Sequence, residues 1–372
     1  MKKVLHISKF YYPYFGGIED VVYNIVDELR AQYHQRVICF NHERTGAIRT
    51  MDNGVEIVRV NTPFVVASQP ISISYLWHLR KEIQSFRPDI IHVHFPNPLV
   101  TLYLWMINLH GARLIIHWHA DVIGKTALYK LYRPLECKAL ERADAIIATS
   151  KQYIGKSVPL QPFKDKIIIL PNIVNEEKMR LLAGEEDEVQ RIRDQYAGKK
   201  IVLFMGRHVE YKGICYLLKA AQWLDDDCVV LIGGTGELTQ ILTQKAKAQK
   251  DKIKFIGRLP SLEMKYHMYA ASVFAFPSID RREAFGVVLA EALYCGLPAV
   301  SFHIEGSGTT WVNQNGQTGL VVDTIDARQY AEAINTLLRD DKRREQYGEN
   351  AKQWVRANFL KDKIQIISKI YG

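Results

Sequence analysis

Two carboxylates with a fixed spacing are the most informative feature of this 372-residue sequence. Glu283 comes just before an apolar run with helical periodicity, and Glu291 follows eight residues later, about two turns into the expected helix. At roughly 1.5 Å of rise per residue, the two lie about 12 Å apart along the axis. That distance is on the order of the length of a sugar–diphosphate–ribose unit. The same spacing is equally typical of an amphipathic helix with two solvated glutamates.

The expected start of this helix offers further groups to an anionic ligand. The amides of Ala284, Phe285, Gly286 and Val287 would face anionic oxygens, because the positive end of the helix dipole favours negative charge. Carboxylates accept hydrogen bonds from hydroxyl groups. Glu283 is therefore predicted to bind a sugar, and the carboxylate two turns later a ribose.

A second motif supplies cations. Gly206-Arg207 and Lys212-Gly213 follow the apolar run Ile201–Met205. Arg207 offers a fork of donors to a diphosphate, and Lys212 offers a mobile point charge. Gly206 lets the backbone come close to a ligand. The loop is not a Walker A sequence, and the alternative is a solvated surface loop.

Taken together, these motifs resemble those of a known enzyme family. With Pro277-Ser278, Gly296-Leu297-Pro298, Gly16-Gly17 and the segment His117 to Asp121, they are similar to the retaining glycosyltransferases of family 4. The resemblance covers nearly the whole chain. The segment Gly306 to Val322 further resembles bacterial polysaccharide mannosyltransferases.

The resemblance implies an α/β fold of the GT-B type, with two doubly wound Rossmann-like domains facing a cleft. Residues 1–172 would bind the acceptor and residues 173–354 the nucleotide-sugar donor. The final helix, residues 355–372, would cross back to the N-terminal domain. The periodicity of the chain agrees, because apolar β-branched runs alternate with helical patterns throughout. The strands expected are 4–8, 36–40, 56–60, 90–94, 114–118, 145–149, 167–170, 201–205, 228–233, 253–256, 273–276, 299–302 and 319–322.

Three residues of the N-terminal half complete the expected site. The amides of Gly16 and Gly17 would approach the donor diphosphate, although a tight turn would also explain the pair. The resemblance places His119 against the donor sugar. His117 and His119, like His92 and His94, face one way along a strand. Because no third ligand follows at a recognisable spacing, no metal site is predicted.

Residues expected to bind the nucleotide lie in the C-terminal half. Gly234 belongs to a glycine-rich turn that would line the nucleotide, and it lacks the spacing of a dinucleotide fingerprint. The resemblance places the base against Arg258 and Leu259, although an exposed turn is an equal reading.

The resulting hypothesis is a retaining glycosyltransferase that needs no metal or other cofactor. The two cations would stabilise the departing diphosphate, which would itself take the acceptor proton. Mannose from GDP-mannose is the first choice of donor, and a UDP-sugar the second. The acceptor would be a lipid-linked or polysaccharide glycan in surface glycan biosynthesis, such as lipopolysaccharide. The alternatives are a nucleotide-sugar epimerase and a non-catalytic nucleotide-sugar binding protein.

Composition and charge point to a cytoplasmic protein. The sequence is 48% hydrophobic and 24% charged, which is ordinary for a soluble protein. Residues 1–172 hold 21 Lys and Arg against 14 Asp and Glu, so most of the net charge of +9 lies there. This half is expected to meet an anionic acceptor or the inner face of the cytoplasmic membrane, although solubility alone would also explain the charge. No nucleic-acid-binding motif is present.

Several further segments carry expectations. No run is long enough to span a membrane, no cleavable leader is expected, and the five scattered cysteines are typical of reduced thiols. A charged helix is expected over 176–196, a core helix over 99–109, and largely helical structure from 343 to 372. The basic segment 127–142 fits either a solvated face over a core stripe or a contact with anionic lipid.

Overall fold

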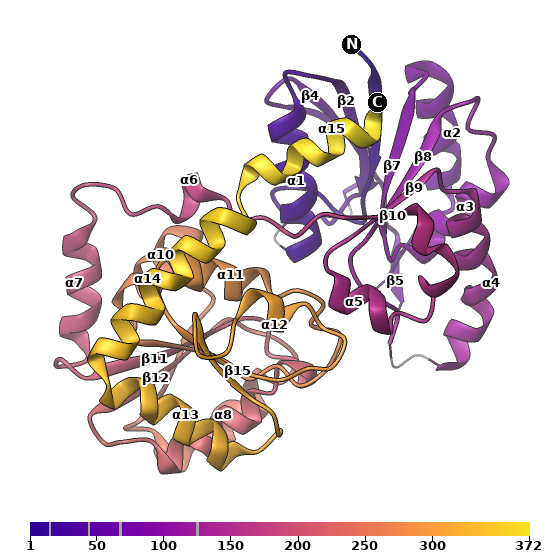
Figure 1. Ribbon diagram of the computed structural model, residues 1–372. Coiled ribbons are helices and arrows are strands. Elements are labelled where there is room, and N and C mark those ends of the chain that lie inside the picture. Colours follow the sequence, from indigo (N-terminus) through magenta and orange to yellow (C-terminus); the bar gives the residue numbers. More distant parts are fainter. Residues whose placement is uncertain (15, 44, 67–68, 124–125) are drawn as a thin grey trace. The chain divides into compact units, whose positions relative to one another are not determined.

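The chain forms two compact units (Figure 1). The computed structural model describes residues 1–14, 16–43, 45–66, 69–123 and 126–372. The first unit comprises Met1–Pro171 and Lys361–Gly372, and the second comprises Asn172–Leu360. Both termini therefore belong to the first unit.

The first unit contains a sheet of eight strands in the order β10-β9-β8-β7-β1-β2-β4-β3. All neighbours are parallel except β3, which pairs antiparallel with β4. The strands are β1 (Lys3–Ile7), β2 (His34–Phe40), β3 (Ile48–Asp52), β4 (Val55–Val60), β7 (Ile90–Phe95), β8 (Arg113–Trp118), β9 (Ala145–Ala148) and β10 (Ile167–Ile169). A separate antiparallel sheet consists of β5 (Phe64–Val66) and β6 (Gln69–Ile71). The helices are α1 (Gly17–Leu29), α2 (Ser74–Phe86), α3 (Pro98–Met106), α4 (Thr126–Arg142), α5 (Lys151–Lys156), η1 (Gln161–Lys166), η5 (Lys361–Ile364) and α15 (Gln365–Tyr371).

The second unit contains a six-stranded parallel sheet in the order β13-β12-β11-β14-β15-β16. Its strands are β11 (Lys200–Met205), β12 (Cys228–Gly233), β13 (Ile253–Gly257), β14 (Val273–Phe276), β15 (Ala299–Phe302) and β16 (Gly319–Val322). Its helices are α6 (Glu176–Met179), α7 (Glu186–Gln195), η2 (Glu210–Lys212), α8 (Ile214–Ala220), η3 (Ala221–Trp223), α9 (Thr239–Lys245), η4 (Ala246–Gln249), α10 (Ser261–Ala270), α11 (Val287–Tyr294), α12 (Thr309–Val312), α13 (Ala327–Arg339) and α14 (Asp341–Asn358).

Burial on both faces explains why the predicted strands form. In β11, Leu203 packs into one apolar cluster, whereas Val202 and Phe204 pack into another. This alternation follows from the two-residue period of a strand, and such strands read as continuous apolar runs. All the predicted strands are confirmed, with ends shifted by at most two residues. The sequence did not predict β3, whose residues are mostly exposed and form no apolar run.

The single helix expected over residues 176–196 is wrong, because two helices, α6 and α7, replace it. Gly184 has a φ of +90°, which a helix does not accommodate. The carboxylate of Glu185 accepts hydrogen bonds from Lys265 Nζ at 2.6 Å and from Tyr266 Oη at 3.1 Å. These tertiary contacts with α10 fix the non-helical link.

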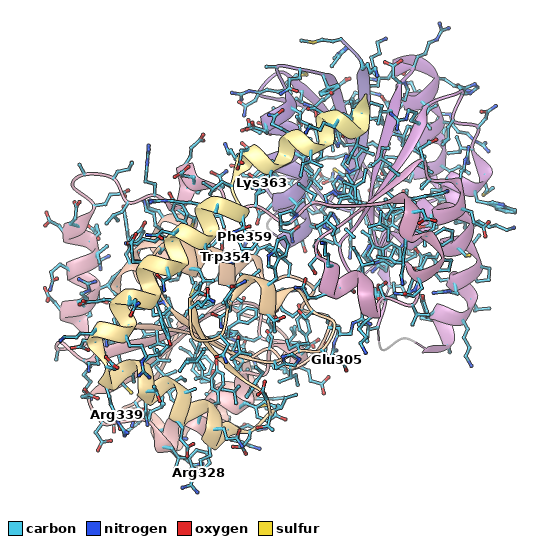
Figure 2. The ribbon with its side chains drawn as sticks, in the orientation of Figure 1. Glu305, Arg328, Arg339, Trp354, Phe359 and Lys363 are labelled. Carbon is cyan, nitrogen blue, oxygen red and sulfur yellow. The ribbon has the colours of Figure 1, made fainter. Side chains whose placement is uncertain are left out.

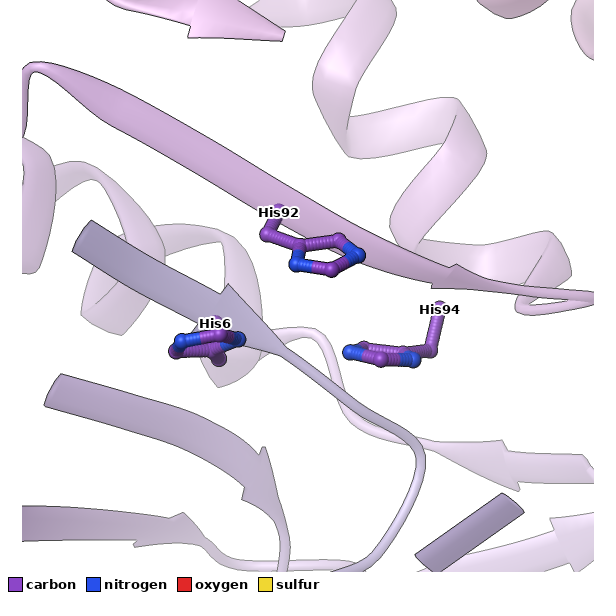
Figure 3. Close-up of side chains that lie close together, drawn as sticks. All are labelled: His6, His92 and His94. Carbon is purple, nitrogen blue, oxygen red and sulfur yellow. The ribbon is translucent and has the colours of Figure 1, made fainter. Parts of the chain in front are cut away.

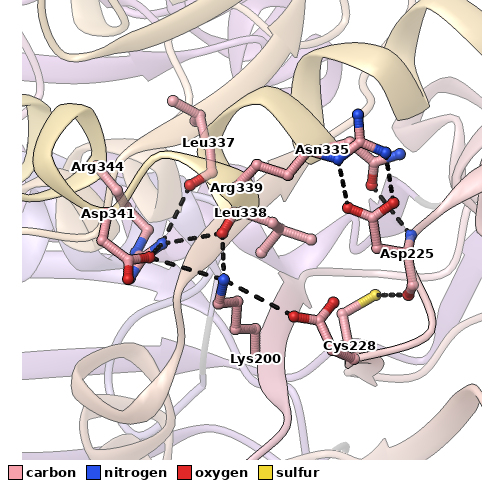
Figure 4. A network of polar contacts seen from close by, with 10 residues as sticks. Lys200, Asp225, Cys228, Asn335, Leu337, Leu338, Arg339, Asp341 and Arg344 are labelled. Carbon is pink, nitrogen blue, oxygen red and sulfur yellow. Dashed lines mark hydrogen bonds and ion pairs between the residues drawn. The ribbon is translucent and has the colours of Figure 1, made fainter.

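A polar network fixes the amino end of β11 to the turn between α13 and α14 (Figure 4). Lys200 Nζ donates to the carbonyl of Leu338 and lies 3.7 Å from the Asp341 carboxylate. Arg339 forms a two-pronged ion pair with Asp225 at 2.6 and 2.8 Å. The network therefore joins residues more than a hundred positions apart in the chain.

The chain leaves the second unit at Leu360, later than the expected position 355. The aromatic ring of Phe359 explains the difference, because its centroid lies 5.4 Å from that of Phe285 and 5.1 Å from that of Trp311. Trp354 Nε1 donates to the Trp311 carbonyl at 3.1 Å. Figure 2 shows Trp354 and Phe359 near the end of α14. These contacts hold the chain in the second unit as far as Leu360. Of the C-terminal segment, the part that belongs to the first unit is therefore η5 and α15.

Among the described residues, no helix combines the length and apolar character needed to cross a bilayer. The core helix expected over residues 99–109 is α3, whose Val100 and Leu104 are buried.

The five cysteines, all within the described ranges, carry free thiols.

Candidate active site

The loop after β11 carries the two predicted cations, and the structure gives them different surroundings. Lys212 is buried, and its Nζ forms an ion pair with the carboxylate of Glu283. Arg207 is exposed, and its Nη2 donates to Tyr211 Oη at 3.1 Å. Two of the predicted catalytic residues, Lys212 and Glu283, are thus brought into direct contact across 71 positions of the chain.

Three segments hold the Glu283 carboxylate and backbone. Lys212 approaches from the β11 loop, and Ser278 Oγ, just beyond β14, donates to Glu283 Oε2 at 3.0 Å. Ser307 Oγ, from the loop after β15, donates to the Glu283 carbonyl. All these segments follow the carboxyl ends of parallel strands, where open α/β sheets bind ligands. The arrangement presents a buried charge pair at this edge of the second sheet.

Sequence reasoning did not assign roles to Ser278 or Arg282. Ser278 belongs to the Pro277-Ser278 pair, whose position after a strand was the available signal. Arg282 binds Asp280 through Nε at 2.9 Å, and its guanidinium lies 5.1 Å from the centre of the Tyr211 ring. Tyr211 therefore contacts two arginines, because it also accepts the hydrogen bond from Arg207.

The predicted helix begins later than expected. α11 starts at Val287, so Glu291 is its fifth residue, just over one turn from the start rather than two. Gly286 precedes the helix with a φ of +87°, and no side chain caps the first amides. The Ala284 carbonyl accepts from Gly308 N at 2.8 Å. The side chain of Phe285 is buried in the core, so this residue offers a ligand only its backbone.

Glycines allow the loops after β11 and β12 to approach each other closely. Gly234 has a φ of +110°, and a Cβ built on it would lie 1.9 Å from the Gly206 carbonyl oxygen. Gly206 N in turn donates to the Gly233 carbonyl at 3.1 Å. At the next strand, Arg258 is exposed, and Leu259 packs against the core. The predicted nucleotide-binding residues thus follow neighbouring strands of one sheet.

In the first unit, Gly16 and Gly17 begin α1. Gly16 precedes the helix in an extended conformation, and a Cβ on it would lie 2.2 Å from the Glu19 carboxylate. At Gly17, apart from the chain neighbours and the helix's own backbone, no described residue has an atom within 4 Å of the position that a Cβ would take. The neighbouring Phe15 lies outside the described residues. A close approach to the Gly17 backbone is therefore sterically possible.

His119 follows β8 and is buried. Its Nε2 lies 2.9 Å from His94 Nδ1, and burial lowers the pKa of the ring to about 3, so the imidazole is neutral at pH 7. The adjacent Asp121 accepts from Trp118 Nε1 at 3.0 Å and from Ser157 Oγ at 2.7 Å. These bonds give Asp121 a structural role in the loop.

A pocket of about 300 Å³, lined by both polar and apolar residues, lies elsewhere in the first unit. Its lining includes Tyr12, Glu43, Asp52 and Arg59. The Arg59 guanidinium donates to the Tyr12 carbonyl at 2.5 Å, which fixes the loop that carries the tyrosines. Tyr12 itself is exposed.

Comparisons with known proteins agree with this architecture. The family described as Glycosyltransferase Family 4 matches residues 15–178, and Glycosyl transferases group 1 matches residues 185–354. The chain is 30% identical to O-antigen chain mannosyltransferase C of Escherichia coli, over 97% of this chain and 95% of that protein. It is 29% identical to a GDP-mannose-dependent alpha-(1-6)-phosphatidylinositol monomannoside mannosyltransferase of Mycolicibacterium smegmatis, over 96% and 94% of the two chains.

Solved structures are similar in fold. Anabaena Alr3699/HepE, solved in complex with UDP and glucose, gives a TM-score of 0.80 at 17% identity and covers 100% of this chain and 99% of its own. The two family matches span most of the sequence, and the Escherichia coli relative aligns over nearly its whole length. The chain therefore belongs to the family 4 glycosyltransferases and is an enzyme with the GT-B fold.

Proposed function

We propose that this glycosyltransferase moves mannose from GDP-mannose, with retention of configuration, to a hydroxyl group of a lipid-linked or polysaccharide acceptor in surface glycan biosynthesis. The observation that carries the proposal is the buried pair of Lys212 and Glu283 at the carboxyl edge of the second sheet. The pair provides a fixed positive charge and a carboxylate that can accept hydrogen bonds from hydroxyl groups, both close to the start of α11.

The pair suits a sugar diphosphate because its members have complementary capacities. An ammonium group has three N–H donors, so Lys212 can hold Glu283 and still donate to a phosphate oxygen. The Glu283 carboxylate can accept further hydrogen bonds, in this case from sugar hydroxyl groups. Arg207 adds an exposed cation to the same loop. Glu291, in the second turn of α11, is assigned to the ribose.

In the proposed reaction, the bond between the anomeric carbon and the phosphate oxygen breaks, and its electron pair stays on the phosphate. The acceptor oxygen forms the new bond from the same face and gives its proton to that phosphate oxygen. Lys212 and Arg207 stabilise the charge that develops there. His119, neutral because it is buried, orients a sugar hydroxyl. No protein nucleophile or metal takes part in these steps.

The donor assignment is supported by two of the relatives. One is named as a mannosyltransferase and the other as GDP-mannose-dependent. The alternative is a UDP-sugar, since the HepE structure contains UDP and glucose. In the second unit, Gly234, Arg258 and Leu259 are assigned to the nucleotide, and in the first unit Gly16 and Gly17 to its diphosphate.

Thermal unfolding with a panel of GDP-, UDP- and ADP-sugars tests the donor. At a concentration of 100 Kd, GDP-mannose is expected to stabilise the second unit by about 2.7 kcal/mol, which corresponds to roughly 5–10 °C. If the protein is a GDP-mannose-dependent transferase, GDP is expected to be released from GDP-mannose only when an acceptor glycan is present. A larger shift with UDP-glucose would overturn the donor assignment. Conversion of the donor without acceptor would indicate an epimerase, and binding without turnover would indicate a sensor.

We further propose that the first unit contacts the inner face of the cytoplasmic membrane through α3 and α4. Trp105, Leu128 and Leu131 are exposed, the last to 78%. Lys130 is exposed nearby, and Lys138 Nζ lies 5.1 Å from the Trp105 ring centre. Of the residues expected as a core stripe, Leu140 is buried, but Leu131 is not. Exposed apolar groups among basic ones suit an anionic lipid surface.

Replacing Leu131 with glutamate is expected to weaken binding to anionic vesicles roughly 10-fold or more, because it removes apolar area and adds a like charge. Co-sedimentation with phosphatidylglycerol vesicles measures the effect. Leu182→Glu, at an exposed leucine of the second unit, is the matched control. Equal binding by the two variants would remove α4 from the proposed contact.

A further inference from the structure

Five buried histidines gather on three adjacent strands of the first sheet. His6 lies on β1, His92 and His94 on β7, His117 on β8, and His119 just beyond it. His6 pairs in register with His92, and His94 with His117. All five are at most 6% exposed. The two-residue period of a strand places them on one face of the sheet. From the sequence alone, no metal site is predicted among these histidines.

Two triads in this cluster have metal-ligand spacing. One nitrogen from each of His6, His92 and His94 lies within 4.8 Å of the others, and the same holds for His94, His117 and His119. Figure 3 shows the first triad, with the rings of His6 and His94 below that of His92 and all three turned toward one another. A metal held by three imidazoles at about 2.0–2.1 Å needs nitrogens about 3.3 Å apart. Starting from the largest spacing of 4.8 Å, a shift of about 1 Å or less in each ring would reach this distance.

The hydrogen bonds favour the first triad. His6 Nε2 lies 2.9 Å from Gln35 Oε1, and the Gln35 amide nitrogen donates to the Val26 carbonyl at 2.8 Å. Because Gln35 Oε1 can only accept, His6 Nε2 must carry the proton. His6 Nδ1 therefore has a free lone pair, and this buried atom has no hydrogen-bond partner among the described residues.

His92 and His94 also have one ring nitrogen next to a neighbour. His92 Nδ1 lies 2.7 Å from Tyr371 Oη, and His94 Nδ1 lies 2.9 Å from His119 Nε2. In both rings Nε2 is buried and has no partner in the described part of the chain. Each member of the first triad thus has one ring nitrogen held by a neighbour and one unsatisfied. Metal-ligating histidines typically show this division. His117 differs, because neither of its ring nitrogens has a hydrogen-bond partner within the described ranges.

Three buried ring nitrogens without a partner are unfavourable unless a ligand satisfies them, because a buried polar group loses its hydrogen bonds to water on folding. A neutral imidazole with a free lone pair is the form of histidine that binds metal ions.

We propose that His6, His92 and His94 bind a divalent transition metal ion of the zinc class as a structural site of the first unit. Imidazole nitrogens suit zinc, cobalt and nickel, and the site contains no hard oxygen ligand that would favour magnesium or calcium. The ion would join β1 to β7. Through Tyr371 it would also connect the sheet to α15. The steps assigned to Lys212 and Glu283 involve no metal, whereas the ligand His94 contacts His119, the residue assigned to the sugar.

Metal analysis of the untagged full chain tests the proposal. The protein is exposed to zinc or cobalt and dialysed against metal-free buffer. Inductively coupled plasma mass spectrometry is then expected to find about one metal ion per chain. The cobalt protein should show the visible absorption of a low-symmetry site. His6→Gln and His92→Gln are expected to lose at least about nine-tenths of the metal, whereas His117→Gln should keep it. Tyr371→Phe removes only the supporting bond and should lower affinity roughly 10–100-fold.

His110→Asn is the matched control, because this histidine is exposed, lies in the same unit and has a positive φ that asparagine tolerates. If a buried variant fails to fold, anomalous diffraction from the wild-type zinc protein decides, with a peak expected between His6, His92 and His94. A metal-free wild-type protein, a peak beside His117 and His119, or equal loss in the His110 variant would each overturn the proposal.

Discussion

Replacing Lys212 with alanine is expected to lower the rate of sugar transfer about 100- to 1,000-fold, which is the usual effect of removing one preorganised charge-stabilising donor. Lys212 is the buried cation of the site, and its position is fixed by Glu283. Release of the nucleoside diphosphate at saturating donor and acceptor measures the effect. The variant also leaves Glu283 buried with Ser278 as its remaining side-chain partner, so some loss of stability is expected as well.

Lys219→Ala is the matched control, since this lysine is exposed on α8, seven residues further along the chain. Its transfer rate should equal that of the wild type. Circular dichroism and the unfolding midpoint separate the loss of chemistry from the loss of folded protein. A folded Lys212→Ala enzyme that transfers sugar within about threefold of the wild-type rate would refute the proposed phosphate role.

The second large effect is expected from Gly213→Ala. Gly213 has a φ of +62°, and a Cβ there would lie 2.0 Å from the carbonyl oxygen of Pro277 and 3.0 Å from Ile279 Cγ2. The backbone must therefore move, which separates Lys212 from the segment that carries Ser278. We expect a loss of about 3 kcal/mol in the stability of the second unit, or roughly 6–12 °C in its unfolding midpoint.

Gly198→Ala isolates the conformational part of this effect. Gly198 has a similar φ of +71°, but apart from its two chain neighbours no described residue has an atom within 4 Å of the position of its Cβ. Its replacement should cost only the strain of a left-handed alanine, about 1–2 kcal/mol. If the two variants unfold at the same temperature, the close contact with Pro277 contributes nothing to stability.

Most of the sheet framework was predictable because buried parallel strands leave a local signal. The run Cys228–Gly233 is apolar throughout, and the strand occupies those residues. Elements stabilised by tertiary contacts left no such signal. The break between α6 and α7 depends on Lys265 and Tyr266, some 80 residues away. The edge strand β3 is mostly exposed, so its sequence shows no apolar pattern. It forms because its backbone pairs with that of β4.

The candidate site shows the same division. The types and spacing of Arg207, Lys212 and Glu283 indicated a phosphate and sugar site, but not that Lys212 and Glu283 would pair. That contact depends on β11 and β14 being neighbours in the sheet, which is a property of topology. The histidine cluster was missed for a related reason. The sequence showed two pairs on two strands, whereas His6 joins them only through the register of β1 with β7.

The division of the first unit between the two ends of the chain has a consequence for its synthesis. The second unit is one continuous stretch, so it can fold once Leu360 has left the ribosome. The first unit begins earlier but needs α15, whose Tyr371 contacts His92. The half of the enzyme that is translated first is therefore the last to be completed, and chains that terminate early would lack its closing helix.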